Sequence, residues 1–228
     1  MLPSFEPIPS ITRRDHVAAA LRKSILAGQI KPGTQLVESG LAAQFGVSRG
    51  LLREAIRELI ESGLVVNRPY AGTFVTEINE HLLRDVYDVR RVIERQAYIT
   101  IWPHRDASFR TELQHRFDLM MDAVHRGDLN EESQLEALFH GLVYERCGNH
   151  LMPALWQQLT QKIQLGFAIC QVSNAPKINF EDNHLKFLQL ALGDDLNALL
   201  AELEVHLGRG LATIVFSSFN TPSEEPTT

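Results

Sequence analysis

The chain has 228 residues, of which 44% are hydrophobic and 22% charged, and its formal net charge at pH 7 is −6. This apolar fraction excludes a wholly disordered protein, and the length suits one or two domains. No stretch reaches the roughly 18 unbroken apolar residues of a membrane helix, and the first residues lack the basic flank and apolar run of a signal peptide. We therefore expect a cytoplasmic protein with no membrane partner.

The charge is distributed unevenly along the chain. Residues 1–79 carry nine Lys and Arg against seven Asp and Glu, whereas residues 80–228 carry 13 against 21. Such asymmetry suggests two modules with different partners. The sequence accordingly predicts a flexible arm over 1–11, one module over 12–78, a second over 79–217 and a disordered tail over 218–228. The two cysteines, Cys147 and Cys170, are too few for a disulfide framework and are expected to be buried thiols.

The first module reads as three helices followed by a hairpin. Apolar residues at helical spacing predict helices over 15–27, 38–45 and 48–62, with Ser48 as the N-cap of the third. Two β-type runs, 64–66 and 73–75, then flank a turn that contains Pro69 and Gly72. This order of elements is the layout of a winged helix-turn-helix.

The helix over 48–62 has two faces. Its apolar face comprises Leu52, Ala55, Ile56 and Leu59, and beside it lie three arginines spaced by four residues, Arg49, Arg53 and Arg57. A recognition helix needs one anchored side and one side that presents cations to the major groove, where an arginine fork binds phosphate or guanine bidentately. In the hairpin, Arg68 is placed to reach a phosphate or the minor groove. The alternative is a solvated helix whose arginines pair with its glutamates.

Residues 16–76 resemble the DNA-binding domain of GntR-family bacterial transcription regulators. The resemblance is carried by LRKSILAGQIKPGTQLVE (21–38), LAAQFGVSR (41–49), LREAIRELIESGLV (52–65) and RPYAGTFV (68–75). It implies that Ser48, Arg49 and Arg53 contact operator DNA, that Gly72 in the wing enters the minor groove, and that the protein binds pseudo-palindromic double-stranded DNA as a homodimer. The chain departs from many members in having Gly50-Leu51 where they have Thr-Pro.

The second module reads as helix throughout. The predicted helices cover 80–102, 106–126, 130–147, 150–173, 179–192 and 195–217, and the connections between them are short. Such a pattern fits an antiparallel all-helical bundle of six to seven helices. The fold class predicted for the whole chain is therefore mainly α.

Three histidines and one acid of this module have a suggestive spacing. Glu136 and His140 lie four residues apart on one helix, and His184 and His206 lie among apolar neighbours on two others. One carboxylate and three imidazoles would suit zinc, nickel, manganese or iron. On spacing alone, satisfied core or rim histidines are the commoner explanation.

Residues 80–215 resemble the FCD ligand-binding domain of the FadR-type subfamily of GntR regulators. LFHGLVYERCGNHLM (138–152), EDNHLKFLQLALGDDLNALLAELEVHL (181–207) and RDVYDVRRVIERQA (84–97) carry the likeness. It implies a divalent metal, zinc first, bound by His140, His184 and His206, with Glu136 where Asp is usual. It also implies a small organic-acid effector, for which Arg90 and Asn149 are candidate contacts. Their alternatives are an ion pair with Glu94 for Arg90 and a helix cap for Asn149.

The function predicted from these observations is a ligand-responsive transcription regulator, expected to be a repressor. One alternative is a DNA-binding protein whose helical domain is structural and holds no metal. Another is a metal-dependent enzyme fused to a DNA-binding domain, although the sequence contains no G-x-G-x-x-G, G-x-S-x-G or H-E-x-x-H motif. We therefore expect no catalytic residues.

Overall fold

The computed structural model describes residues 12–172 and 179–219. The arm predicted over 1–11 and residues 220–228 of the predicted tail lie outside these ranges. Internal contacts divide the chain into two units, and the boundary in the sequence falls between Glu77 and Ile78. Among the described residues, none of the helices combines the length and the apolarity that a membrane crossing requires.

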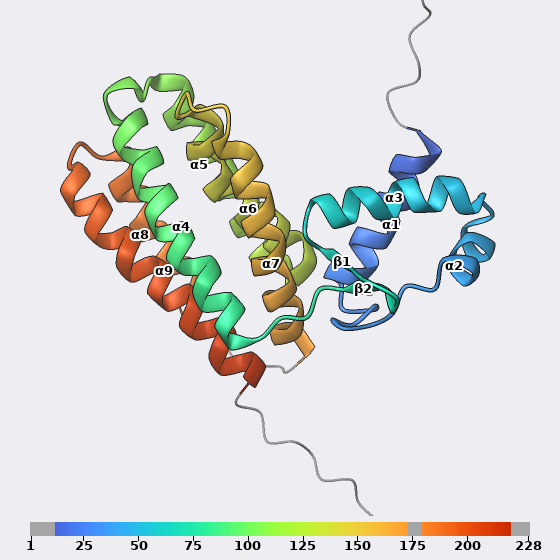
Figure 1. Cartoon of the computed structure of the whole chain (residues 1–228). Helices are drawn as coiled ribbons and strands as arrows, with labels where there is room; N and C mark the ends of the chain where they lie inside the picture. The colour runs from blue at the N-terminus through green and yellow to red at the C-terminus, as the bar shows by residue number, and fades with distance from the viewer. Residues whose placement is uncertain (1–11, 173–178, 220–228) are drawn as a thin grey trace, which may run out of the picture. The chain divides into compact units, whose positions relative to one another are not determined.

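The first unit contains three helices and a two-stranded antiparallel sheet (Figure 1). In chain order these are α1 (Arg13–Leu26), α2 (Glu38–Phe45), α3 (Arg49–Glu61), β1 (Val65–Arg68) and β2 (Gly72–Val75). The helix termini follow from local chemistry: Thr12 and Asp15 form a capping box at the start of α1, and Gly46 ends α2 with a φ of +62°. The winged helix-turn-helix predicted from the sequence is confirmed.

The core of this unit lies where α1 and α3 pack together. Leu21 and Ile25 of α1 and Leu52 and Leu59 of α3 are at most 1% exposed. The hairpin pairs Val65 with Val75 at its base. Because that core holds the inner face of α3, the opposite face of the helix is left on the surface.

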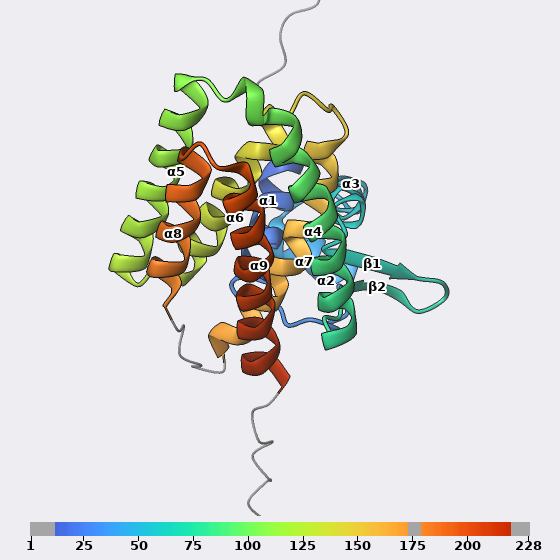
Figure 2. The same cartoon turned by 90° about the vertical axis from the view of Figure 1, so that its left-hand side faces the viewer.

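The second unit is entirely helical in the part of the chain that is described. It comprises α4 (Glu80–Ile101), the short 3-10 helix η1 (Trp102–His104), α5 (Ala107–Arg126), α6 (Leu129–Arg146), α7 (Met152–Val172), α8 (Phe180–Leu192) and α9 (Leu196–Phe219). Helix α9 packs against α4, α7 and α8, and α6 packs against α4, α5 and α7 (Figures 1 and 2). The mainly α prediction, with six main helices here, is confirmed.

Most ends of these helices lie within one residue of the sequence prediction, and two differ from it by two residues. Helix α7 begins at Met152 rather than at residue 150, because the amide of Leu151 donates to the side chain of Asn149 and holds a turn there. Helix α9 continues to Phe219, two residues into the segment predicted as a tail. Cys147 is 6% exposed, as expected for a buried thiol.

Candidate functional site

The exposed face of α3 carries the arginines predicted from the sequence. The apolar face of this helix is buried, and its four residues are at most 3% exposed: Leu52, Ala55, Ile56 and Leu59. Ser48 is the N-cap, and its Oγ accepts a hydrogen bond of 3.2 Å from the amide of Leu51. Arg49, Arg53 and Arg57 are all exposed. The helix therefore has the anchored and the cationic face that contact with a DNA groove requires.

Two of these arginines pair with glutamates. Arg53 Nε lies 2.7 Å from Glu38 Oε2 on α2, and Arg57 Nη1 lies 3.3 Å from Glu54 Oε1 one turn away. The side chain of Arg49 has neither an ion pair nor a hydrogen bond within the described ranges. The alternative, in which the arginines of this helix pair with its own glutamates, is therefore observed for Arg57 but not for Arg53, whose partner lies on α2. Exposed pairs of this kind contribute little stability, so a phosphate can replace the glutamate at small cost.

The hairpin supplies a further cation, Arg68, beside its turn. Arg68 lies 4.8 Å above the ring of Phe74 and pairs with Glu77 at 3.2 Å. Gly72 has a φ of +107°, and a β-carbon there would lie 3.0 Å from Nε2 of Gln35, which donates to the carbonyl of Ala71. Both the backbone conformation and the contact with Gln35 therefore favour glycine at position 72. The contact with DNA that the sequence resemblance implies is a separate reason for a glycine there.

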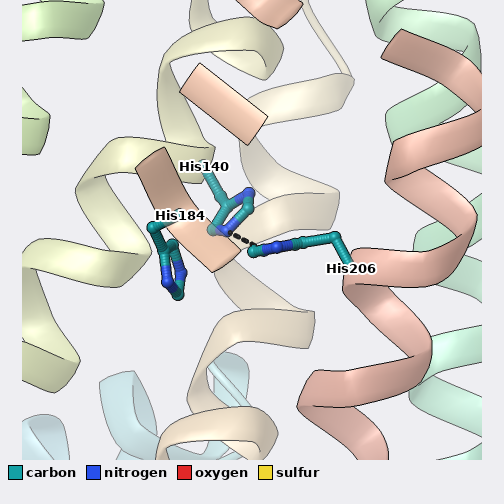
Figure 3. A group of neighbouring side chains, drawn as sticks. All are labelled: His140, His184 and His206. Carbon is teal, nitrogen blue, oxygen red and sulfur yellow. Dashed lines mark hydrogen bonds between the residues drawn. The ribbon is translucent and has the colours of Figure 1, made fainter. Parts of the chain in front are cut away.

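Three imidazoles meet in the core of the helical unit (Figure 3). His140 on α6, His184 on α8 and His206 on α9 are 1%, 4% and 7% exposed, and their candidate ligand atoms all lie within 4.8 Å of one another. Nε2 of His140 lies 3.2 Å from Nε2 of His206. Residues up to 66 positions apart in the sequence are therefore brought together, as the resemblance implied and as spacing alone did not require.

The outer nitrogens of two of these rings are held by acceptors. Nδ1 of His140 lies 3.0 Å from Oε1 of Glu94, and Nδ1 of His184 lies 2.8 Å from the carbonyl oxygen of Phe180. A backbone carbonyl has no proton to donate, and the carboxyl of Glu94 is ionised because its pKa is about 2. In both pairs the imidazole is therefore assigned as the donor, with its proton on Nδ1. For His140 this leaves the lone pair on Nε2, the atom that faces Nε2 of His206.

Burial favours the neutral form of two of the imidazoles, those of His140 and His206. Burial, and then the positive charge of Arg90, lower the pKa of His140 against the opposing effect of Glu94. Burial, and then the neighbouring His184 and His140, lower the pKa of His206 well below its usual value. Neutral imidazole is the form that binds a metal, so these two rings are in the binding form at neutral pH.

Glu136 lies next to this cluster. Its Oε1 is 3.9 Å from Nε2 of His184, and its side chain is 12% exposed. The four predicted ligands thus line one small region between α6, α8 and α9.

The donor set fits a divalent metal. Two imidazole nitrogens on one tetrahedral ion, each at about 2.0–2.1 Å, lie about 3.3 Å apart, close to the spacing observed between His140 and His206. The fit rests on this spacing, because an imidazole binds one ion through one nitrogen only, and an ion at Nε2 of His206 would leave its buried Nδ1 without a hydrogen-bond partner among the described residues.

Glu94 is the residue that joins the cluster to its surroundings. It is 0% exposed, and its carboxylate accepts hydrogen bonds from Arg90 Nε at 2.8 Å and Tyr144 Oη at 3.1 Å, besides facing His140. Burial opposes its ionisation, but the charge of Arg90 and the ring of His140 outweigh burial and hold the pKa of Glu94 at about 2. Sequence reasoning saw Glu94 only as an ion-pair partner of Arg90, since nothing in the sequence signals its contact with His140 on another helix.

A small cavity lies beside the histidines. Its volume is about 50 Å³, and its polar lining comprises Arg90, Glu136, Asn183, His184, His206, Arg209 and Thr213, with Tyr87 and Phe180 among its aromatic residues. Arg90 forms the ion pair with Glu94 that was the alternative, and it also lines the cavity, while its contact with an effector stays a prediction. Its Nη2 atom is buried and has no hydrogen-bond partner in the described part of the chain.

Asn149 lies elsewhere. It is exposed in the turn between α6 and α7, where its Oδ1 accepts a hydrogen bond of 3.0 Å from the amide of Leu151. It is not part of the lining of the cavity. The expected effector contact at Asn149 is therefore corrected to the capping role, because the residue is held at the surface by its own turn.

Sequence reasoning also missed Arg209. This residue of α9 lines the cavity, and its Nη1 donates to Oε1 of Glu202, which is 4% exposed, at 2.8 Å. Its only sequence signal was its position three residues after His206, on the helix turn that follows.

Comparison with known families assigns both units. The family model described as bacterial regulatory proteins of the gntR family matches residues 13–75, and the FCD domain model matches residues 85–209. Among curated proteins, the gluconate operon transcriptional repressor of Bacillus licheniformis is 26% identical over 193 residues, covering 82% of this chain and 79% of the relative. The transcriptional repressor RspR of Escherichia coli (strain K12) is 33% identical over 128 residues, covering 54% of each chain.

Solved structures agree in fold. The GntR protein from Rhodococcus sp. RHA1 superposes with a TM-score of 0.76 at 24% identity, covering 90% of this chain and 98% of that one. McbR/YncC of E. coli superposes with a TM-score of 0.75 at 20% identity, covering 90% and 97%. The curated relatives are transcription regulators and not enzymes.

Proposed function

Because the chain belongs to the GntR family of bacterial transcription regulators and carries an FCD domain, we propose that it is a ligand-responsive repressor whose helical domain senses a small carboxylate through a bound divalent metal. DNA binding is the property of the family, whereas the metal, the effector and the sign of regulation are parts of the proposal. The observation that carries it is the buried cluster of His140, His184 and His206, with Arg90 at the same cavity.

At the DNA, Ser48, Arg49, Arg53, Arg57, Arg68 and Gly72 form the proposed contact surface. The arginines of α3 would exchange their exposed glutamate partners for phosphates and base edges in the major groove. Two copies of this surface, related by the two-fold axis of a homodimer, would read the two halves of a pseudo-palindromic operator.

In the helical domain, Glu136, His140, His184 and His206 would hold the metal. A divalent ion bound by three neutral imidazoles and one carboxylate retains one positive charge, which an effector carboxylate can neutralise. Zinc is the first candidate, with nickel, manganese and iron as the others. Arg90 would orient the effector carboxylate through its unpartnered Nη2 atom, with Arg209 as a second cation at the cavity.

The size of the cavity supports a small effector. A volume of about 50 Å³ holds about three or four water-sized groups. Arg90 and Arg209 are already balanced by Glu94 and Glu202, so the cavity has little excess charge for a large polyanion. The proposed ligand class is therefore a small organic acid with one carboxylate bound at the metal.

Regulation then requires that the effector bind two arrangements of the dimer unequally. Contacts in the cavity favour one arrangement of the DNA-binding units, and operator DNA favours another, so that the effector changes DNA affinity through this difference. For a repressor, the effector-bound arrangement is the one with lower DNA affinity.

The proposal is tested by metal content. We expect the full-length protein, purified without chelator, to carry about one divalent ion per chain, and His184→Ala to lose most of it because one of three imidazole ligands is gone. His81→Ala is the matched control, since that histidine lies on α4 with a side chain that is 86% exposed. Emission spectroscopy identifies and counts the metal, and far-UV circular dichroism checks the fold.

Equal metal content in His184→Ala and in the wild type would refute the three-histidine site. If His184→Ala does not fold, His184→Gln preserves more of the side-chain volume and answers the same question. A thermal-shift screen of small organic acids on the same samples then identifies an effector, because a ligand that binds only the folded state raises its unfolding temperature.

A further inference from the structure

The two arginines that line the cavity are held differently. The side chain of Arg90 is only 3% exposed, and its Nε lies 2.8 Å from Oε2 of Glu94. The side chain of Arg209 is 39% exposed, so it stands where the cavity meets solvent. In the proposed function, Arg90 orients one carboxylate of the effector. Arg209 is therefore a second cation, at the other end of the cavity, that a bound acid can reach.

Arg209 shares its acidic partner with a lysine on another helix. Glu202 precedes Arg209 by about two turns of α9, and its Oε1 accepts a hydrogen bond of 2.8 Å from Nη1 of Arg209. The other oxygen of Glu202, Oε2, pairs with Nζ of Lys186 on α8, the helix that packs beside α9 (Figures 1 and 2). One carboxylate thus lies between two cations, and this triad of Lys186, Glu202 and Arg209 has one positive charge in excess.

The second cation of the triad allows Arg209 to change partner. Glu202 is 4% exposed, and a buried carboxylate that loses every cation is strongly destabilising. Because Lys186 remains at Oε2, Glu202 can release Arg209 and still have a compensating charge. Arg209 is itself partly solvated, and ion pairs of such groups contribute little stability. Transfer of Arg209 from Glu202 to a carboxylate in the cavity therefore has a small cost.

Arg90 cannot change partner in the same way. Its acid, Glu94, also contacts the hydroxyl of Tyr144 and the neutral ring of His140, but no second cation pairs with Glu94 within the described ranges. Release of Arg90 would leave two buried charges without compensation. The cavity thus has one fixed arginine, which offers only its free Nη2 atom, and one arginine that can turn its whole guanidinium to a ligand.

We infer that the effector is a short dicarboxylic acid, and that its second carboxylate takes Arg209 from Glu202. The first carboxylate lies at the proposed metal and Arg90, and Arg209 binds the second through charge-assisted, bidentate hydrogen bonds. The excess charge of the triad is then neutralised, which suits one further carboxylate and no more. Lys186 acts as a positioning residue, since it compensates Glu202 without touching the effector. The inference rests on the proposed function and adds the class of acid and the residue that selects it.

The lining and the size of the cavity limit the length of this acid. Phe167, Phe180 and Leu207 also line it and suit the methylene groups between two carboxylates. A volume of about 50 Å³ has room for a short chain only, which corresponds to an acid of about three to five carbon atoms. Because Arg209 is partly exposed, the second carboxylate lies toward solvent and takes little of this volume.

Pairs of acids with equal chain length test the inference. Isothermal titration calorimetry of the metal-loaded, full-length protein compares propionate with malonate, butyrate with succinate, and pentanoate with glutarate. In at least one pair, the wild type should bind the dicarboxylate about tenfold or more tightly than the monocarboxylate. Metal content is measured again after each titration, so that removal of the ion by a dicarboxylate is not mistaken for binding.

Three variants should change dicarboxylate affinity and leave monocarboxylate affinity alone. Arg209→Met should reduce the preference for the dicarboxylate to within about threefold. Lys186→Met should weaken dicarboxylate binding about threefold or more although Lys186 does not line the cavity, because Glu202 then holds Arg209 more firmly. Glu202→Gln should strengthen it by a similar factor, because Arg209 is released. Arg126→Met, which removes an exposed arginine paired with Glu131, is the matched control and should change neither affinity.

The inference is overturned if the wild type binds both members of every pair within about threefold of each other. It is equally overturned if the preference persists in Arg209→Met or is unchanged in Lys186→Met. In these cases binding of monocarboxylates still supports the proposed function, whereas failure of every acid to bind would overturn both. Circular dichroism verifies the fold of each variant, and if Arg209→Met does not fold, Lys186→Met decides alone, since that side chain is 57% exposed.

Discussion

At the scale of single residues, Glu94 connects three side chains of the helical unit. Its buried carboxylate neutralises the charge of Arg90, accepts a hydrogen bond from the hydroxyl of Tyr144 and determines which nitrogen of His140 carries the proton. A carboxylate that holds the outer nitrogen of a metal-binding imidazole raises the basicity of the inner one. Glu94 therefore links the proposed effector contact, Arg90, to the proposed metal ligand, His140.

Replacing Glu94 with glutamine tests this link. Glu94→Gln leaves Arg90 as an uncompensated buried charge, so we expect it to lower the free energy of unfolding by about 3–5 kcal/mol. In the folded fraction, metal affinity should fall by about 10–100-fold, measured by competition with a chromophoric chelator. Unchanged metal affinity would show that Glu94 supports only the core.

Tyr144→Phe gives a milder test of the same network. It removes a single hydrogen bond to Glu94 and keeps the ring stacked on Trp156. The expected loss of stability is about 1 kcal/mol. This variant remains informative if Glu94→Gln fails to fold.

Arg53 is the most direct test of the DNA-binding face. Arg53→Ala removes a cation from the middle of the exposed stripe, and its ion pair with Glu38 is exposed, so the fold should not change. We expect operator affinity to fall by about fivefold to 100-fold, measured by fluorescence anisotropy. Arg84→Ala, which breaks an exposed pair with Glu80 in the helical unit, is the control. If both variants bind alike, α3 is not the recognition helix.

How far single residues could be predicted depended on how local their partners are. The three histidines were found because spacing and resemblance both mark them. Glu94 was missed as a partner of His140 because the two lie 46 residues apart and meet only when α4 packs against α6. Asn149 was misplaced as an effector contact because its turn, rather than its sequence neighbourhood, decides where it points.

At the scale of elements, the N-terminus of α3 combines capping with the proposed DNA contact. Ser48 caps the helix, and the free amides behind it favour a phosphate. Since Ser48 is exposed, its capping role and its role toward DNA can be separated by substitution.

Two substitutions of Ser48 separate the roles. Ser48→Asp preserves the cap but places a negative charge where a phosphate would bind, so it should leave stability within about 0.5 kcal/mol and weaken DNA binding. Ser48→Ala should lower the free energy of unfolding by about 1 kcal/mol. Urea unfolding measures the stability of each variant, and fluorescence anisotropy measures its DNA affinity. Wild-type DNA affinity in Ser48→Asp would exclude a phosphate at this helix end.

The elements themselves were largely predictable. All nine helices and the hairpin described here lie within a few residues of the predicted ranges, because apolar spacing, glycines and N-cap residues mark them locally. The exact start of α7 was not predictable, since it depends on the turn that Asn149 closes. The conformation of Tyr70 was also hidden, because only the backbone shows a positive φ at a residue that rarely adopts it.

At the scale of the whole molecule, the net charge of −6 is distributed unevenly between the two units. Most of the acidic excess lies after residue 79, in the helical domain, while the first unit has a slight excess of cations and presents three arginines on α3 and Arg68 beside the turn of the hairpin. The family shows that these two units belong to one regulator. In the account proposed here, a dimer couples them, so that an effector bound in the helical domain changes the affinity of the DNA-binding units.

The most direct test of this account is the effect of a small organic acid on DNA affinity with and without the metal. The acid is one that stabilises the full-length protein in the thermal-shift screen, and the DNA is a duplex that the wild-type protein selects from a randomised pool. We predict that the acid lowers the affinity of the metal-loaded protein, that chelation abolishes this response, and that restoring the ion restores it. An equal response from the metal-loaded and the metal-stripped protein would contradict the account.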